Sequence, residues 1–251
     1  MAGISDINLD KLPSHVAVIM DGNGRWAEQK GNGRIFGHQN GVVAVRETVE
    51  AAAELGIGYL TLYAFSTENW NRPREEINAL MSLLVLTIQD EIKTLNDNNV
   101  RLKVIGDTNS LPVKVKKRLN NAIKDTSSNT GLNLVLALSY SGRWEIMNAV
   151  RGIAEDVRDG KIEINDLGDD TFCKYLNSSE IPDPELLIRT SGEFRISNFL
   201  LWQIAYTELY FTDILWPDFR KEHFFEAILD FQKRERRFGK ISSQLKGESV
   251  N

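Results

Sequence analysis

The stretch HVAVIMDGNGRWA, residues 15–27, decides the fold of this chain. Residues 16–20 are apolar at every position, which is typical of strands buried on both faces of a parallel sheet. The run ends at Asp21, and open α/β sheets bind ligands beyond the carboxyl ends of their strands. Two glycines follow, which allow the backbone to approach a ligand and to point its amides at an anion, and Arg25 adds a positive charge. The stretch therefore predicts a buried strand that ends at a carboxylate beside a cradle of phosphate size.

Length and composition indicate a globular protein with one large domain. The chain has 251 residues, of which 42% are hydrophobic and 26% are charged, as is ordinary for a globular fold. We expect residues 1–251 to form a single domain, with a core that runs from about residue 12 to about residue 239 and flexible termini. A net charge of −5 argues against a nucleic-acid partner.

The sequence also indicates a compartment. The single cysteine, Cys173, excludes an internal disulfide framework and suits a reducing cytosol. Residues 1–14 show neither the basic segment nor the apolar segment of a secretory signal, and no run reaches the roughly 18 apolar residues of a membrane span. The expected location is therefore cytoplasmic.

Strand-like and helix-like segments alternate along the chain. Apolar runs predict strands over residues 16–20, 59–65, 100–105, 132–138, 186–188 and 209–211. Apolar residues at helical spacing predict helices over residues 41–55, 73–95, 113–124, 144–157 and 224–237. Repeated β-then-α units predict an α/β fold in which a mainly parallel central sheet has helices on both faces.

Polar side chains gather where three of these strands end. They are Asp21, Asn23, Arg25, Arg34 and His38 after the first strand, Ser66, Glu68, Asn69, Trp70 and Arg72 after the second, and Arg189, Glu193, Arg195 and Ser197 after the strand at 186–188. In a parallel sheet these three sets converge on one rim. Arginines bind oxygens in pairs, and a hard divalent cation binds carboxylate together with phosphate. The set therefore suits a polyanion that is held partly through a metal ion.

Each of these residues also has a plainer interpretation. An Asp-Gly pair is most often a turn, and His38 taken alone is typical of a helix-capping or surface histidine. Trp70 can be core packing, and Arg72 before a proline can be a solvated loop residue. The functional interpretation therefore depends on the coincidence of polar residues at three strand ends, and not on any single residue.

The apolar segments show a second pattern. Residues 77–95 carry an apolar stripe at helical spacing, which widens around the middle turns. One interpretation is a helix buried between the sheet and a dimer partner or neighbouring helix. The other is that this helix and the strand at 132–138 line an elongated apolar cavity. Glu208 lies in an aromatic-rich stretch, where a carboxylate needs a partner, a cation or a metal ion, from this subunit or from a second one.

Missing motifs narrow the chemistry. The sequence has no GxxxxGK[ST] motif of P-loop nucleotide hydrolases and no DDxxD pair of helical trans-prenyl synthases. The segment GNGRIFG, residues 31–37, matches a dinucleotide-binding fingerprint only loosely and does not follow a strand. A phosphatase with an aspartyl nucleophile requires a second acid two residues after the first, and Asn23 stands there instead.

Taken together, the motifs resemble those of the cis-prenyltransferase family, specifically bacterial undecaprenyl diphosphate synthases. They are HVAVIMDGNGRWA, GRIFGHQNG, LTLYAFSTENWNRP, SYSGRWE, IRTSGEFRISNFLLWQIAYTELYF and WPDF, in that order between Leu12 and Gly239. The resemblance implies an α/β sheet with a hydrophobic tunnel, a homodimer, and a requirement for Mg²⁺. It also implies repeated condensation of isopentenyl diphosphate onto farnesyl diphosphate, with each new double bond cis. The product would be a long polyprenyl diphosphate, undecaprenyl diphosphate, which carries glycans for cell-wall assembly.

The resemblance also implies a role for each matching residue. Asp21 would engage Mg²⁺ and assist departure of the allylic diphosphate, and Glu208 would complete the metal site. Asn69 would help to remove the proton, and because an amide is a poor base we expect it to orient a water or a diphosphate oxygen that accepts the proton. The substrate-binding residues would be Gly22, Asn23, Gly24, Arg25, Trp26, Arg34, His38, Ser66, Thr67, Glu68, Trp70, Arg72, Arg189, Arg195, Ile196 and Ser197.

Three serines depart from the family pattern. Ser139 and Ser141 stand where many relatives carry asparagine and glycine, and Ser191 replaces a frequent glycine. These departures concern the geometry of the site and not its chemistry.

Two functions of different class fit the resemblance. One is an active enzyme, and the other is a catalytically silent partner subunit of a prenyltransferase complex. The enzyme is favoured because the chain retains Asp21, Asn69, Arg189, Arg195 and Glu208, none of which a scaffold needs. The sequence leaves the length of the product open. Peripheral contact with a membrane is expected for release of a lipid product.

Overall fold

The central sheet is parallel throughout. The structure is a computed structural model, and it describes residues 3–236. Its strands are β1 (His15–Ile19), β2 (Tyr59–Ser66), β3 (Arg101–Ile105), β4 (Asn133–Tyr140), β5 (Leu186–Arg189) and β6 (Glu208–Phe211). They form one six-stranded sheet in the order β3-β4-β2-β1-β5-β6, and every neighbouring pair is parallel. The predicted single-domain α/β fold with a parallel sheet is confirmed.

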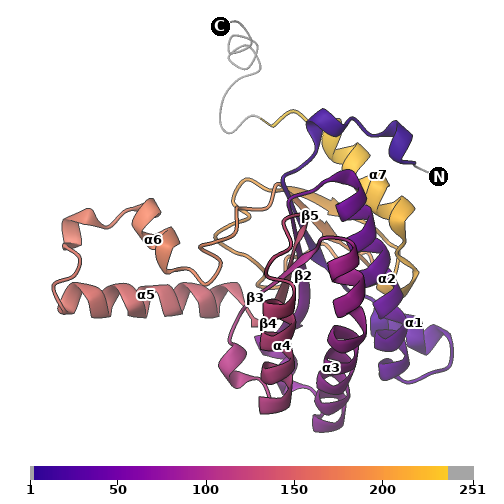
Figure 1. The fold of residues 1–251 in the computed structure, drawn as a ribbon, viewed down its shortest axis with the longest axis horizontal. Helices are drawn as coiled ribbons and strands as arrows, with labels where there is room; N and C mark the ends of the chain where they lie inside the picture. Colours follow the sequence, from indigo (N-terminus) through magenta and orange to yellow (C-terminus); the bar gives the residue numbers. More distant parts are fainter. Residues whose placement is uncertain (1–2, 237–251) are drawn as a thin grey trace, which may run out of the picture.

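Helices follow most of the strands, as the sequence pattern predicts. They are α1 (Asn23–Gln29), α2 (Arg34–Leu55), α3 (Arg74–Asp97), α4 (Val113–Asp125), α5 (Gly142–Arg158), α6 (Asp169–Tyr175) and α7 (Lys221–Gln232). Single 3-10 turns are η1 (Ile4–Asp6), η2 (Leu9–Lys11), η3 (Thr67–Asn71), η4 (Thr108–Ser110), η5 (Ile164–Asp166) and η6 (Trp216–Asp218). The helices flank the sheet, but unevenly. Figure 1 shows α5 and α6 extending away from the body of the molecule.

The two faces of the sheet have different covers. Alternate strand residues such as Val16, Val18 and Leu60 pack with buried residues of α2, α3, α4 and α7 in the larger core cluster. On the opposite face, Ala17 and its neighbours pack against Trp144 of the first turn of α5 and against the irregular segment 196–204. The helices α2, α3, α4 and α7 therefore lie on one face, and the second face is closed mainly by irregular chain and the start of α5.

The helix prediction was wrong in four places, the first being α2, which begins at Arg34 and not at residue 41. The helices α1 and α6 were not predicted, because each is only seven residues long and α1 lies in a glycine-rich stretch that is a poor helix former. The last helix ends at Gln232 and not at residue 237. There the chain turns away, and Arg234 forms ion pairs with Glu208 and Asp230 at 2.9 and 2.5 Å. Residue 237 itself and the tail that follows lie outside the described residues.

Glycines in α2 bring that helix against α1. A Cβ atom on Gly37 would lie 1.9 Å from the carbonyl oxygen of Asn23, and one on Gly41 would lie 2.5 Å from its Oδ1. Only a residue without a side chain permits this approach. Gly37 and Gly41 of the GRIFGHQNG motif therefore serve helix packing.

An apolar cavity of about 260 Å³ lies between the sheet and the helices α2 and α3. Leu134, Leu136 and Leu138 of β4 line it on the sheet side, and the apolar stripe of α3 lines it on the helix side. Polar residues stand near the carboxyl ends of the strands, namely Asn23, His38, Asn69 and Arg72. The second interpretation of the apolar pattern, an elongated cavity lined by this helix and this strand, is supported.

Candidate active site

Asp21 is fixed by backbone contacts from several segments. Its backbone N–H donates to the Thr190 hydroxyl at 2.9 Å, and that hydroxyl donates to the Asp21 carbonyl at 2.7 Å. The same carbonyl accepts the N–H of Trp216 at 3.0 Å. Gly22 adopts a left-handed conformation with φ 107°, and its N–H donates to Asp21 Oδ1 at 2.7 Å. The carboxylate is thus held at the point where β1 ends and α1 begins.

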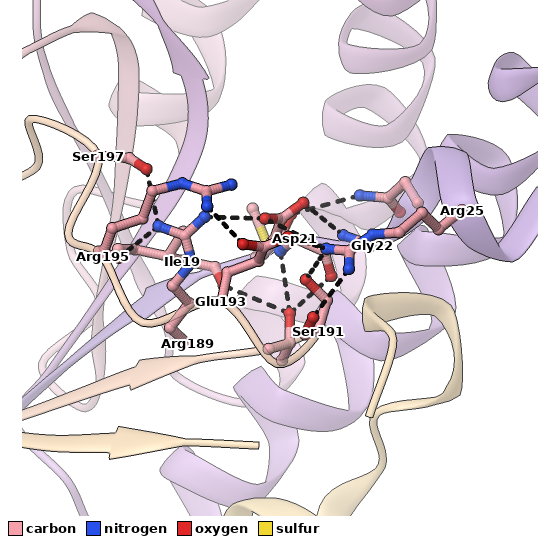
Figure 2. A network of polar contacts seen from close by, with 12 residues as sticks. Ile19, Asp21, Gly22, Arg25, Arg189, Ser191, Glu193, Arg195 and Ser197 are labelled. Carbon is pink, nitrogen blue, oxygen red and sulfur yellow. Dashed lines mark hydrogen bonds and ion pairs between the residues drawn. The ribbon is translucent and has the colours of Figure 1, made fainter. Parts of the chain in front are cut away.

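Arg189 at the end of β5 supports this carboxylate from a buried position. Its side chain is only 3% exposed, and its Nη2 lies 2.9 Å from Asp21 Oδ2. Its Nη1 donates to the Ser197 hydroxyl at 2.7 Å and to the carbonyl of Arg195. One guanidinium therefore joins the end of β1 to the segment 195–197, as Figure 2 shows.

Two more arginines complete the network in Figure 2. Arg25 donates to the carbonyl of Ser191 at 3.0 Å and lies 3.3 Å from Glu193 and 3.7 Å from Asp21. Arg195 also pairs with Glu193. Three guanidinium groups thus share two carboxylates, which leaves an excess of positive charge. An excess of guanidinium groups over carboxylates is what a site for a polyanion requires.

The backbone beside this network is strained. Ser191 and Ser197 have φ values of 78° and 47°, in the left-handed region that costs a residue with a side chain about 1–2 kcal/mol. This explains why a glycine is favourable at position 191. Ser139 and Ser141 are the other two serines that depart from the family pattern. Ser139 also has a left-handed conformation, with φ 50°, whereas Ser141 is extended with φ −155°. Strain of this kind concentrates at functional sites.

A second polar set stands at the mouth of the cavity. A register shift at the end of β2, between Tyr63 and Ser66, leads into η3, which carries Asn69. The Asn69 side-chain carbonyl accepts the N–H of Ser66 at 3.0 Å. This bond leaves the amide NH₂ of Asn69 as a donor toward the cavity that it lines. Asn69 is therefore built to donate hydrogen bonds and not to take a proton itself.

His38 lines the same mouth from α2. Burial lowers the pKa of His38 to about 4, and the positive charges of Arg72 and Arg34 act in the same direction against the opposing effect of Glu76. The imidazole is therefore neutral near pH 7. Arg72 itself pairs with Glu76 at 2.9 Å, so it is not simply a solvated loop residue.

Other predicted site residues lie away from the cavity lining or have structural partners. Trp26 is buried and stacks on Phe36, with ring centroids 5.7 Å apart. Trp70 packs edge-on against Phe65, and its indole N–H donates to the Ser139 hydroxyl at 2.9 Å. The remaining predicted contacts are placed as follows: Gly24 beside the side chain of Arg34, Arg34 exposed and 3.7 Å from Glu28, Thr67 bonded to Glu68, and Ile196 packed on the second core cluster.

Glu208 is not brought to Asp21 within one chain. In the parallel pairing of β5 with β6, Leu186 lies opposite Glu208, and Arg189 lies opposite Phe211. Glu208 therefore stands at the amino end of the sheet, whereas Asp21 and Arg189 stand at the carboxyl end. Its carboxylate pairs with Arg234 at 2.9 Å. Within residues 3–236 there is also no group of three or more His, Cys, Asp or Glu side chains placed to hold a metal ion.

Comparison with known proteins identifies the family. The family model described as "Putative undecaprenyl diphosphate synthase" matches residues 19–239. The chain belongs to the cis-prenyltransferase family. As a cis-prenyltransferase it is an enzyme, a transferase of prenyl groups.

Individual members of the family are similar over almost the whole chain. A protein from Chlorobaculum tepidum named isoprenyl transferase is 53% identical over 239 residues, which are 95% of this chain and 90% of the relative. A ditrans,polycis-undecaprenyl-diphosphate synthase ((2E,6E)-farnesyl-diphosphate specific) from Pasteurella multocida is 51% identical over 234 residues, 93% of this chain and 98% of the relative.

A solved structure extends the similarity to three dimensions. The crystal structure of lavandulyl diphosphate synthase from Lavandula x intermedia, in complex with dimethylallyl diphosphate, matches with a TM-score of 0.89 and 35% identity. The match covers 92% of this chain and all of that one, at 100%. In the part of this cis-prenyltransferase that the structure describes, no helix is both long enough and apolar enough to cross a bilayer.

Sequence reasoning missed two residues that organise the site. Thr190 holds the backbone of Asp21, and Asn198 joins three segments around Ser197. Both lie inside the motif IRTSGEFRISN next to residues that were selected. Their only signal in the sequence is this adjacency, because neither carries a charge.

Proposed function

We propose that this cis-prenyltransferase adds isopentenyl diphosphate repeatedly to farnesyl diphosphate and releases undecaprenyl diphosphate, the lipid carrier for cell-wall or glycan assembly. One observation carries the proposal: a cluster of arginines and one fixed carboxylate stands at the end of the sheet where the long apolar cavity has its polar mouth. Such a site suits a molecule with a diphosphate head and a hydrocarbon tail. The name of the relative from Pasteurella multocida supports this substrate and this product.

Different residues would bind the diphosphates of the two substrates. Arg25, together with the first-turn amides of α1 that have no acceptor inside the helix, would hold the allylic diphosphate beside Asp21. Arg189, Arg195 and Ser197 would hold isopentenyl diphosphate. As the allylic carbon–oxygen bond breaks, its electron pair leaves with the diphosphate, and arginines stabilise the charge that develops there. The new carbon–carbon bond forms from the isopentenyl double bond, and a proton is then lost.

The proton would pass to an oxygen that Asn69 orients. Its side-chain carbonyl is already occupied by the N–H of Ser66, so its NH₂ group is the part free to act. A donor of this kind can hold a water or a diphosphate oxygen in place as the acceptor.

The donor set fits Mg²⁺ bound jointly with substrate. This ion is commonly bound by one or two carboxylates together with substrate phosphates, and it keeps several waters. Asp21 provides one such carboxylate, and no all-protein cage exists within residues 3–236. Asp21 would hold the ion, which neutralises charge on the leaving diphosphate. Glu208 stands at the other end of the sheet, so its predicted part in a metal site requires the second subunit of a homodimer.

The growing chain would enter the apolar cavity. Burial of hydrocarbon contributes about 25 cal/mol per Å² removed from water, so each five-carbon unit tightens binding by a few kcal/mol. The longest products therefore leave slowly, and peripheral contact with a membrane would offer them an apolar acceptor. The cytoplasmic location expected from the sequence belongs to the same proposal.

The test is incubation with farnesyl diphosphate, labelled isopentenyl diphosphate and Mg²⁺, followed by mass analysis of the extracted products. We expect a ladder of products that ends near eleven isoprene units. A shorter end point would keep the enzyme and revise the size of the product. Absence of elongation by a folded protein supplied with Mg²⁺ would contradict the proposal and favour a catalytically silent subunit.

A further inference from the structure

Asn198 lies between helix α5 and the loop that follows β2, and it forms hydrogen bonds with both. It follows Ser197 directly and has a left-handed conformation with φ 60°. Its backbone carbonyl accepts the N–H of Gly142 at 2.7 Å, and its Oδ1 accepts the N–H of Arg143 at 3.0 Å. Asn198 thereby satisfies two amides in the first turn of α5, which fixes its own position against a rigid helix.

The other side-chain atom of Asn198 reaches the loop after β2. Its Nδ2 donates to Glu68 Oε1 at 2.7 Å, and Glu68 is the residue immediately before Asn69. Burial alone raises the pKa of Glu68, but hydrogen bonds, that from Asn198 foremost, lower it below its usual value. Glu68 is therefore ionised near pH 7, and the bond from Asn198 is charge-assisted.

A second contact reinforces the same connection. Tyr63 of β2 stacks on Phe199, with ring centroids 4.2 Å apart and an angle of 10° between the planes. This stacking places the residue after Asn198 against the strand that leads into η3. The Tyr63 hydroxyl also donates to the Ser197 carbonyl at 3.4 Å, so one aromatic contact and two hydrogen bonds join the segment 197–199 to β2 and the loop that follows it.

We propose that Asn198 is a positioning residue, which sets the separation between Ser197, in the half that binds isopentenyl diphosphate, and Asn69, which acts at the reacting carbon. The inference rests on the proposed function. Arg189 bonds Ser197, so the half of the site that would bind isopentenyl diphosphate is anchored to β5. The bond from Asn198 to Glu68 is the direct side-chain link from that half to the loop of Asn69. A bond of this kind aligns the two reacting carbons, and small misplacements of reacting groups are costly.

The test is a double-mutant cycle that exchanges donor and acceptor. Asn198→Asp keeps the oxygen that accepts the Arg143 N–H but places a carboxylate against Glu68. Glu68→Gln then supplies an NH₂ group that donates to this new carboxylate, which restores the bond in the opposite direction. We expect Asn198→Asp to lower kcat/KM for isopentenyl diphosphate about tenfold or more in the wild-type background. In the Glu68→Gln background the same change should cost less than about threefold.

Three further measurements distinguish a positioning role of Asn198 from general damage to the fold and from the effect of an added negative charge. Asn198→Gly keeps the left-handed backbone, adds no charge and removes the side-chain bonds, so it should also raise KM for isopentenyl diphosphate. In each Asn198 variant, binding of farnesyl diphosphate alone should be unchanged by calorimetry, because that half is held by other residues. Asn99→Asp is the matched control: Asn99 has φ 55° and bridges to Thr130 through both side-chain atoms, at the other end of the sheet. Asn99→Asp should leave both the KM for isopentenyl diphosphate and the binding of farnesyl diphosphate unchanged.

The outcomes are distinct. Equal losses from Asn198→Asp in both backgrounds, or wild-type kinetics in Asn198→Gly, would overturn the inference while the proposed function stands. Loss of farnesyl diphosphate binding together with isopentenyl diphosphate binding would show general damage and would also overturn it. A wild-type protein that neither elongates farnesyl diphosphate nor binds isopentenyl diphosphate would overturn the proposed function itself, and this inference with it.

Discussion

The two ends of the central sheet both contain buried polar groups, but they use them differently. At the amino end, His15 is buried and its two ring nitrogens are both bonded, Nδ1 donating to the Pro182 carbonyl at 2.6 Å and Nε2 accepting from Thr61 at 2.7 Å. Glu185 accepts both the N–H and the hydroxyl of Ser14, at 2.5 and 2.7 Å, and pairs with Arg236. These groups satisfy one another.

At the carboxyl end, arginines and strained backbone gather in one place. Three arginines share two carboxylates there, and Ser191, Ser197 and Asn198 all have left-handed conformations. Positive groups exceed carboxylates there. The comparison indicates that the polar groups at the amino end stabilise the fold, whereas those at the carboxyl end leave positive charge available for a ligand. Substitutions at the two ends should therefore separate stability from activity.

The largest expected effect is loss of activity at the carboxyl end. Asp21→Ala should lower turnover about 1,000-fold, because it removes the fixed carboxylate that would hold Mg²⁺ under the proposed function and leaves Arg189 without its ion pair. The protein should remain folded by circular dichroism. Turnover with labelled isopentenyl diphosphate measures the effect, and Asp183→Ala, an exposed acid at the amino end, is the control that should retain activity. Near-normal incorporation by Asp21→Ala would contradict the assignment.

A change of geometry without a change of charge should have the next largest effect. Arg189→Lys keeps the positive charge, but an ammonium group lacks the planar pair of nitrogens with which the guanidinium bonds Asp21 through one and Ser197 through the other. We expect kcat/KM to fall about 100-fold, measured by steady-state kinetics with isopentenyl diphosphate varied. Activity within a few fold of the wild type would show that charge alone suffices at this position.

At the amino end, the expected effect is on stability and depends on pH. Burial lowers the pKa of His15 to about 4 in the folded state, against 6.5 for the exposed group. Between these pH values the unfolded chain binds a proton that the folded protein does not. The free energy of unfolding should therefore be fully retained above pH 6.5 and fall toward pH 4, by up to about 1.4 kcal/mol per pH unit for this group.

Urea unfolding of the wild type and His15→Gln at a series of pH values measures this slope. The variant should show the smaller dependence, with His38 contributing in the same direction to both proteins because its pKa is also lowered to about 4. The specific activity of the folded His15→Gln protein at neutral pH should equal that of the wild type. An unchanged pH slope, or a loss of activity in folded protein, would remove the distinction between the two ends.

The smallest expected effect concerns strain. Ser191→Gly should relieve a left-handed conformation with φ 78° and raise the melting temperature by a few degrees, since about 1 kcal/mol is involved. Arg25 keeps its bond to the carbonyl of residue 191 at 3.0 Å and loses only the hydroxyl partner. Activity should change by less than about threefold. A tenfold loss would show that the serine hydroxyl, and not the backbone, orients Arg25.

Local patterns predicted most of the fold because the periodicity of apolar residues reflects burial directly. The fully apolar run at 16–20 gave a strand with every residue from His15 to Ile19 buried. The stripe at 77–95 gave α3, whose apolar face lines the cavity. Glycine-rich α1 and short α6 have too few apolar positions to show a helical period, so tertiary contacts such as the approach of Gly37 to Asn23 decide them.

The candidate site was predictable only in outline. Asp21 and Arg189 were selected because each follows a strand, and parallel pairing of β1 with β5 does bring them to 2.9 Å. Glu208 was selected from its apolar surroundings, but the register of β6 places it at the opposite end of the sheet within one chain. Glu208 directly precedes the predicted strand at 209–211, so parallel pairing alone places it at the amino end, and its apolar surroundings report burial and not position along the strand.

The sequence by itself determined that this chain forms a parallel α/β sheet with polar and charged residues after three strands, because strand burial and strand ends are local properties of the chain. Only the tertiary structure decided which of those residues share one network. It also decided that the Asn69 side-chain carbonyl is occupied by Ser66, that Arg189 is buried beside Asp21, and that Asn198 bonds both α5 and Glu68. These facts depend on atoms from segments far apart in the sequence, whose distances are set by packing and by the register of the strands.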